Sequence, residues 1–382
     1  MSKEHISFIV ESAHGHINPT LPLAEKLVER GYRVSYAVKE YFAPRVLATG
    51  AKPLVYRPLE NKLIIFSELR KSSQDKFAFD FDKVDVEKYK ELIRLERLDT
   101  LRQLEDIYQS DRPDLIIYDT CNIAGRMLAR MWGILMAEHS PMMIYPDSPD
   151  DFDFDSEHDA NLVLVSLPMF FQRNASELEA RFRCIGPLYN SGASFRRWDG
   201  KCKSKNQILV SATTGLLPQV EYFATAVRAF SDMPFNVVLS IGDELDPESL
   251  PFLPDNFEIN QHSSQQEILK SCCLFVCHSG TSSIFEALKL GVPLIVAPPS
   301  QVHDIYATRV AELGLGVRLA GCEFTAENLR KAATAVVDDA AVLQRVREAQ
   351  REILSFDGAE RGADILETYI ANGRINQPAL SS

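Results

Sequence analysis

The sequence predicts an α/β protein made of two doubly wound domains, each with a parallel sheet. Apolar runs that are typical of buried strands alternate with amphipathic helical segments along most of the chain. A stretch rich in glycine, serine and lysine interrupts this alternation near the middle. At 382 residues the chain is long enough for two separate cores. We therefore expect a domain at 1–186, a linker at 187–206 and a domain at 207–382, whose last helix (about 358–372) can fold back toward the first domain.

Composition and charge limit the kinds of binding partner and indicate the cellular compartment of the protein. A hydrophobic share of 46% and a charged share of 25% are typical of soluble globular proteins, and no apolar run is long enough for a membrane helix. The formal charge of −12 argues against nucleic acid or an anionic membrane as a partner. Seven cysteines at spacings that suit no zinc site, with no signal-peptide segment after Met1, predict reduced thiols and a cytoplasmic protein.

The first 38 residues predict a strand-helix-strand unit. An apolar strand at 5–11 precedes a helix for which Asn18 serves as the N-cap and Pro19 lies in the first turn. Gly31 ends that helix, and a second strand follows at 32–38.

One histidine and one aspartate stand where such a sheet binds ligands. His16 lies just beyond the carboxyl end of the first strand, and Asp119 ends a later strand at 113–119. Open α/β sheets bind ligands at the carboxyl ends of their strands. A histidine that takes up a proton is helped by a carboxylate that fixes its tautomer. The residues alone leave two interpretations open: His16 is a general base, or it only caps the helix.

The second half predicts a strand, a turn of small residues and a helix from about Thr281. Further strands are expected at 207–212, 235–242, 257–261, 273–280, 292–299 and 315–320. Backbone N–H groups and hydroxyls at the start of that helix can bind an anion, and His278 adds a donor. Glu286, one turn further, can accept hydrogen bonds from a ribose diol. The spacing therefore suits a nucleoside diphosphate, although the same residues are common in helix capping.

These motifs together resemble one enzyme family over nearly the whole chain. The segments that carry the resemblance are "GHINPTLPLAEKLVERGYRV" (15–34), "PDLIIYD" (113–119), "CIGP" (184–187), "ILVSATTG" (208–215), "HSGTSSIFEALKLGVPLIVAP" (278–298) and "ATRVAELGLGVRL" (307–319). They are similar to the family-1 glycosyltransferases of the GT-B fold, particularly the bacterial macrolide and natural-product enzymes.

The resemblance implies a fold and a reaction. Two Rossmann-like domains would face an interdomain cleft, the first binding the acceptor and the second the nucleotide-sugar donor. His16 would deprotonate an acceptor hydroxyl, with Asp119 as its partner, and the hydroxyl would displace the nucleoside diphosphate in line with inversion. The implied co-substrates are a UDP- or TDP-sugar and a small-molecule acceptor, with no cofactor and no metal. The expected donor-binding residues are Thr214, His262, Ser263, Gln265, His278, Ser279, Gly280, Thr281, Ser282, Ser283, Glu286, His303 and Asp304.

Three segments depart from the pattern of the family. The acid or amide pair that holds the sugar falls on Val302 and His303, with Asp304 next. A shift of one residue would let His303 and Asp304 take over, or the sugar differs from glucose. His262 stands in place of the base-stacking tryptophan, and Thr213 in place of a glycine. These changes affect the expected sugar and base more than the fold.

Alternatives remain open at this point both for the acidic segment and for the function. "DDFDFD" (150–155) contains the Asp-x-Asp pattern that binds metal in another glycosyltransferase fold. The seven carboxylates between Asp147 and Asp159 fit a solvated loop, or one that attracts a cationic acceptor. The GT-B architecture also serves nucleotide-sugar epimerases, and a non-catalytic nucleotide-sugar-binding protein would share the donor motif.

Overall fold

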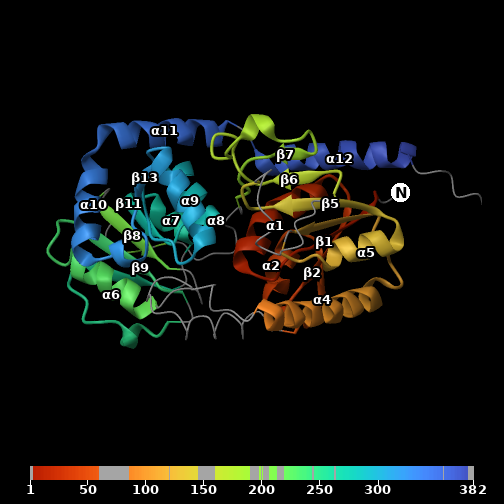
Figure 1. The fold of residues 1–382 in the computed structure, drawn as a ribbon, viewed down its shortest axis with the longest axis horizontal. Helices are drawn as coiled ribbons and strands as arrows, with labels where there is room; N and C mark the ends of the chain where they lie inside the picture. Colours follow the sequence, from red (N-terminus) through yellow and green to blue (C-terminus); the bar gives the residue numbers. More distant parts are fainter. Residues whose placement is uncertain are drawn as a thin grey trace, which may run out of the picture. The chain divides into compact units, whose positions relative to one another are not determined.

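The computed structural model describes residues 3–59, 86–119, 121–144, 160–189, 198, 200, 206–212, 219–242, 245–261, 264–355 and 357–376. It confirms the α/β class, with a parallel sheet and surrounding helices in each of two compact units (Figure 1). Among the described residues, the first unit holds those up to 189 together with 357–376, and the second holds those within 198–355.

The first unit is built on a sheet with the order β3-β2-β1-β4-β5-β6-β7. Its strands are β1 (His5–Ile9), β2 (Arg33–Val38), β3 (Lys52–Val55), β4 (Leu115–Asp119), β5 (Leu135–Ser140), β6 (Val163–Val165) and β7 (Phe182–Cys184). Every residue of β1 and β4 is buried, as expected for central strands of a parallel sheet covered on both faces. The predicted strands at 5–11, 32–38 and 113–119 are thus confirmed, with ends that differ by up to two residues.

The helices of the first unit are α1 (His14–Glu29), α2 (Ala43–Ala48), α4 (Val86–Tyr108), α5 (Ala124–Trp132) and α12 (Gly358–Asn376). Helix α12 packs along α1 and completes the core of this unit with Ala363, Leu366 and Ile370 (Figure 1). At its surface, Arg30 forms ion pairs with three acidic residues of α12, Glu360, Asp364 and Glu367. The C-terminal helix therefore belongs to the same unit as the first strand.

The predicted start of α1 was wrong. The helix begins at His14, with Ala13 as its N-cap and no side-chain hydrogen bond to the cap. Pro19 and Pro22 lie inside the helix, and each removes one backbone hydrogen bond, to the carbonyl groups of Gly15 and Asn18. Instead of capping, Asn18 accepts a hydrogen bond through Oδ1 from Arg45, at 2.9 Å. Gly31 ends the helix as predicted, with φ of 88°.

The second unit has a sheet with the order β10-β9-β8-β11-β12-β13. Its strands are β8 (Gln207–Ser211), β9 (Asn236–Ser240), β10 (Phe257–Asn260), β11 (Cys272–Cys277), β12 (Leu294–Val296) and β13 (Gly316–Arg318). Its helices are α6 (Gln219–Phe230), α7 (Gln265–Leu269), α8 (Thr281–Lys289), α9 (Gln301–Glu312), α10 (Ala326–Asp338) and α11 (Ala340–Leu354). All six predicted strands of this half are present, and α8 begins at the predicted residue.

Each sheet has one point at which the strand order reverses direction. In the first unit this point lies between β1 and β4, and in the second between β8 and β11. Ligands of open α/β sheets bind outside the carboxyl ends of the strands at such points. The fold therefore directs attention to the residues after β1 and β4 and to those after β11.

Some expectations concern residues outside the described part of the chain. These are the acidic segment 147–159, most of the linker, Thr213, Thr214, His262 and Ser263. The six described cysteines are all free thiols. No helix in the described part of the chain is long and apolar enough to cross a membrane.

Candidate active site

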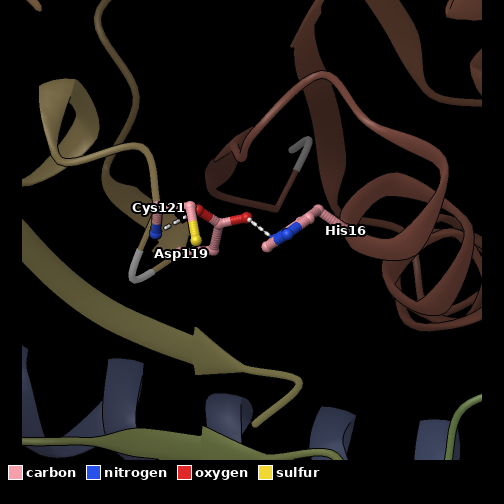
Figure 2. Close-up of side chains that lie close together, drawn as sticks. All are labelled: His16, Asp119 and Cys121. Atoms are coloured by element: carbon pink, nitrogen blue, oxygen red, sulfur yellow. Dashed lines mark hydrogen bonds and ion pairs between the residues drawn. The ribbon is translucent and has the colours of Figure 1, made fainter. Parts of the chain in front are cut away.

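His16 and Asp119 meet at the point where the first sheet reverses its strand order. His16 lies in the first turn of α1, and Asp119 is the last residue of β4 (Figure 2). The His16 Nδ1 atom is 2.8 Å from Asp119 Oδ2. The Asp119 side chain is fully buried, while 21% of the His16 side chain remains exposed. The structure thus brings together the two residues that the sequence singled out, with the imidazole as the accessible partner.

Backbone N–H groups hold the Asp119 carboxylate in place. Oδ2 accepts a bond from the N–H of Glu11 at 3.0 Å, and Oδ1 accepts bonds from Cys121 at 2.9 Å and Asn122 at 2.8 Å. Burial raises the pKa of Asp119, but His16 and these N–H groups outweigh it and lower the pKa below its usual value. Asp119 is therefore an ionised and strongly oriented carboxylate at neutral pH.

The ionised carboxylate fixes the tautomer of His16. A carboxylate only accepts hydrogen bonds, so neutral His16 donates its Nδ1 proton to Asp119 and carries its lone pair on Nε2. Burial lowers the pKa of His16, but Cys121 and Asp119 outweigh it and raise the pKa well above 6.5. The arrangement can take a proton at Nε2 and stabilise the imidazolium that results.

Cys121 is a third member of this site that the sequence analysis missed. Its thiol, the Asp119 carboxylate and the His16 imidazole offer ligand atoms that all lie within 4.8 Å of one another (Figure 2). Among the described residues this is the one group of three His, Cys, Asp or Glu side chains whose ligand atoms lie close enough together to bind one metal ion. The Asp-x-Cys spacing after a buried strand was the available signal, because the turn after β4 folds back onto its own last residue.

A buried histidine lies behind the pair. His139 on β5 is the register partner of Asp119 and contacts Ser166 Oγ through Nε2 at 2.5 Å. Burial lowers the pKa of His139 to about 4. It is therefore neutral at pH 7 and adds no positive charge beside Asp119.

In the second unit, the turn after β11 has an unusual backbone. Ser279 has φ of 66°, a left-handed conformation that is rare for a residue with a side chain. Its buried hydroxyl donates to the carbonyl oxygen of His303 on α9, at 2.8 Å. This contact ties the start of α8 to the start of α9. The hydroxyl of Ser279 is thus used for holding the turn.

Two histidines lie side by side at this turn. The ring centroids of His278 and His303 are 5.8 Å apart. Burial lowers the pKa of His278 to about 3, with His303 adding to the effect, and lowers the pKa of His303 to about 4. The buried Nδ1 atom of His278 has no hydrogen-bond partner among the described residues. A buried polar atom of this kind is costly unless a ligand or water satisfies it.

Glycine is needed at the N-cap of α8. A Cβ atom on Gly280 would lie 2.5 Å from Nε2 of His278, so the imidazole packs directly over this backbone. Thr281, Ser282 and Ser283 form the first turn of α8, and N–H groups there have no intrahelical partner. The helix start therefore offers backbone donors beside the two imidazoles.

Glu286 lies one turn further along α8. Its carboxylate accepts hydrogen bonds from Gln265 at 2.6 Å and from Gln266 at 3.1 Å. Gln265 also contacts the hydroxyl of Ser283 at 3.3 Å. Burial raises the pKa of Glu286 above its ordinary value, although the two amides act in the opposite direction. Three of the expected donor-binding residues are thus brought together here.

The two candidates for holding the sugar differ in their surroundings. His303 lies in the first turn of α9, and its Nδ1 is 2.8 Å from the Ser300 hydroxyl. Asp304 forms a two-point ion pair with Arg318 on β13, at 2.5 and 2.8 Å. The carboxylate of Asp304 is therefore already engaged, whereas the His303 ring faces His278.

Comparison with known proteins identifies the family. Residues 224–360 match the family described as erythromycin biosynthesis protein CIII-like, C-terminal domain. The chain is 33% identical to the NDP-glycosyltransferase YjiC of Bacillus licheniformis, over 97% of this chain and 99% of that enzyme. It is 30% identical to the oleandomycin glycosyltransferase of Streptomyces antibioticus, over 96% of this chain and 91% of that enzyme.

A solved structure agrees with these relatives. CalG4, the calicheamicin glycosyltransferase, superimposes with a TM-score of 0.81 at 28% identity and covers 99% of this chain and 100% of its own. Neither the epimerase nor the non-catalytic alternative is favoured, because the relatives that span the whole chain are named glycosyltransferases. The chain therefore belongs to the family-1, macrolide-type glycosyltransferases of the GT-B fold and is a glycosyltransferase.

Proposed function

We propose that the enzyme transfers a sugar from a UDP- or TDP-sugar to a hydroxyl of a small natural-product acceptor, with inversion and without a metal ion. His16 takes the proton of the acceptor hydroxyl at Nε2, and Asp119 orients the ring and stabilises the imidazolium. The oxygen then attacks the anomeric carbon as the nucleoside diphosphate leaves. A single in-line displacement converts an α-linked donor to a β-glycoside.

The observation that carries this proposal is the contact between His16 and Asp119. A carboxylate that receives three backbone N–H bonds cannot rotate freely, so it presents Oδ2 to Nδ1 in one geometry. The free lone pair is then on the ring nitrogen of an accessible side chain. This is the arrangement of a positioned general base, and such bases contribute about 10² to 10⁴ in rate.

The start of α8 supports the assignment of the donor diphosphate to the second unit. It combines N-terminal N–H groups, the His278 imidazole and the unsatisfied Nδ1 atom of that ring. The growing negative charge on the leaving diphosphate would be stabilised by these donors. Glu286, held by Gln265 and Gln266, is the group in reach to accept hydrogen bonds from the ribose diol.

The acceptor class is inferred from the relatives. One is named for oleandomycin, a macrolide, and the solved relative is named for calicheamicin. We infer a natural-product acceptor of comparable size with a free hydroxyl. The name NDP-glycosyltransferase of the Bacillus licheniformis relative supports a nucleoside diphosphate sugar as the donor. UDP and TDP are the candidates that the resemblance of the sequence motifs implies.

A donor and acceptor panel tests the proposal. Purified enzyme, treated with EDTA and then desalted, is incubated with UDP- and TDP-glucose and a set of macrolides and phenols, and products are followed by mass spectrometry. We expect a mass gain of one hexose, full activity after chelation and a β-linked product by NMR. An α-linked product would refute inversion, and activity that returns only on adding Mg²⁺ or Mn²⁺ would refute metal independence.

A further inference from the structure

Cys121 raises the pKa of His16, and its thiol also brings a third possible ligand atom to the pair formed by His16 and Asp119. Cys121 follows Asp119 by two residues, and its backbone N–H holds Asp119 Oδ1. Its thiol is partly exposed and lies within 4.8 Å of ligand atoms of both His16 and Asp119. A serine would supply the same backbone hydrogen bond, so the sulfur is not needed to hold Asp119.

The three donor atoms have the composition of a zinc site. Thiolate, imidazole and carboxylate are the ligands that Zn²⁺ prefers, whereas Mg²⁺ and Ca²⁺ prefer sets made of oxygen alone. Tetrahedral Zn²⁺ with bonds of about 2.0 to 2.3 Å needs ligand atoms about 3.4 to 3.6 Å apart. His16 Nδ1 and Asp119 Oδ2 are 2.8 Å apart, so they need to separate by only a fraction of an ångström.

The surroundings favour such a site in two further ways. The three backbone N–H groups on Asp119 remain in place when Oδ2 exchanges the His16 proton for a metal, and outer hydrogen bonds of this kind orient metal ligands. His16 and Cys121 are both partly exposed, which gives an ion a route to the three ligands.

We propose that His16, Asp119 and Cys121 form a Zn²⁺ site, and that zinc held there inhibits sugar transfer. The Cys121 thiol releases its proton to solvent as the Zn–S bond forms. If zinc takes Nδ1 of His16, the ring proton moves to Nε2 and the lone pair of the base is lost. If zinc takes Nε2, the metal occupies that lone pair directly. Either way of binding prevents His16 from accepting a proton. Water or the acceptor hydroxyl completes the coordination.

Metal binding and inhibition are tested separately, because only inhibition rests on the proposed role of His16. For binding, chelated enzyme is titrated with Co²⁺, a spectroscopic substitute for zinc, and the thiolate-to-cobalt charge-transfer absorption is followed. We expect the absorption in wild type and in Cys322→Ser, whose thiol is exposed elsewhere on the chain, and its loss in Cys121→Ser and Cys121→Ala. Equal absorption in the Cys121 variants and wild type would overturn the site.

For inhibition, the initial rate of transfer is measured against free Zn²⁺ in a metal buffer and compared within each variant. We expect zinc to inhibit wild type and Cys322→Ser alike, EDTA to reverse the effect, and Cys121→Ser to need at least about tenfold more zinc for the same inhibition.

Equal zinc sensitivity of Cys121→Ser and wild type would overturn the proposal. Cobalt binding at Cys121 without inhibition would overturn the blocking of His16 and count against its role as base. Loss of transfer in His16→Ala without cobalt binding in wild type would reject only the metal site.

Discussion

The histidines of the two units have opposite electrostatic surroundings. His16 shares a hydrogen bond with a buried carboxylate, and its pKa is raised well above 6.5. His278 and His303 lie beside each other, and burial lowers the pKa of each, to about 3 and 4. The first ring is built to hold a proton, whereas the other two are kept neutral until a negative group approaches. The same side chain thus suits proton transfer in one unit and anion binding in the other.

The difference in pKa comes from the residues that each fold places beside its histidines. In the first unit, the reversal of strand order places the end of β4 beside the start of α1, and β4 ends in an acid. In the second, the corresponding turn after β11 ends in Ser279 and Gly280, and the acid that follows His303 in the sequence, Asp304, is paired with Arg318. The first site therefore contains the carboxylate that balances a protonated histidine. In the second site the negative charge has to come from the ligand.

The largest expected effect is on the acid-partnered histidine. His16→Ala should lower kcat by about 10² to 10⁴, because the acceptor hydroxyl loses its base. UDP affinity, measured by calorimetry, should stay as in wild type. His14→Ala changes an exposed histidine in the same turn and should keep most of the activity. Wild-type activity of His16→Ala on a hydroxyl acceptor would exclude the role as base; a thiol acceptor could bypass it and is assayed separately.

Asp119→Asn removes the carboxylate beside His16, so this histidine then lacks an acidic partner, as His278 and His303 do. We expect kcat to fall less than in His16→Ala, with a shifted pH profile. Wild-type kcat/KM should rise with pH as His16 loses its proton, and the raised pKa of His16 sets the rise at high pH. Without the carboxylate that pKa falls, so the rise should move to lower pH while the plateau drops. A profile that keeps its wild-type position would show that Asp119 does not control the base.

His278→Ala removes the ring that lies over Gly280 and that we propose binds the diphosphate. The loss of a hydrogen bond to a charged group costs about 1.5 to 3 kcal/mol, so the Kd for UDP should rise by roughly tenfold to a hundredfold. Calorimetry on His16→Ala provides the reciprocal control, because that variant should bind UDP normally. Unchanged UDP affinity in His278→Ala would contradict the assignment of the diphosphate to this turn.

Much of this contrast could be predicted from the sequence, because it depends on where strands end. Apolar runs gave the positions of β1, β4 and β11, and therefore of His16, Asp119 and His278 at the carboxyl edges. The start of α1 could not be predicted from capping rules, since Ala13 makes no side-chain cap and the prolines lie inside the helix. For Cys121 the available signal was its spacing from Asp119, whereas the ion pair of Asp304 with Arg318 depends on side chains that meet only after folding. No local sequence pattern predicts an ion pair of this kind.

His303→Gln should have the smallest effect and the clearest dependence on pH. Glutamine is the residue that the family generally has at this position, so the fold should tolerate it.

A bound diphosphate puts negative charge beside His278 and His303 and raises their pKa values from about 3 and 4. Binding then takes up protons, so the Kd of wild type for UDP should fall as the pH is lowered into the range of these raised pKa values. With one imidazole gone, His303→Gln should show a shallower dependence and a change of only a few-fold at pH 8, because His303 is neutral there in the free enzyme. Asp304, paired with Arg318, contributes the same charge in both proteins. Parallel pH curves for the two proteins would place the bound diphosphate away from the His303 ring.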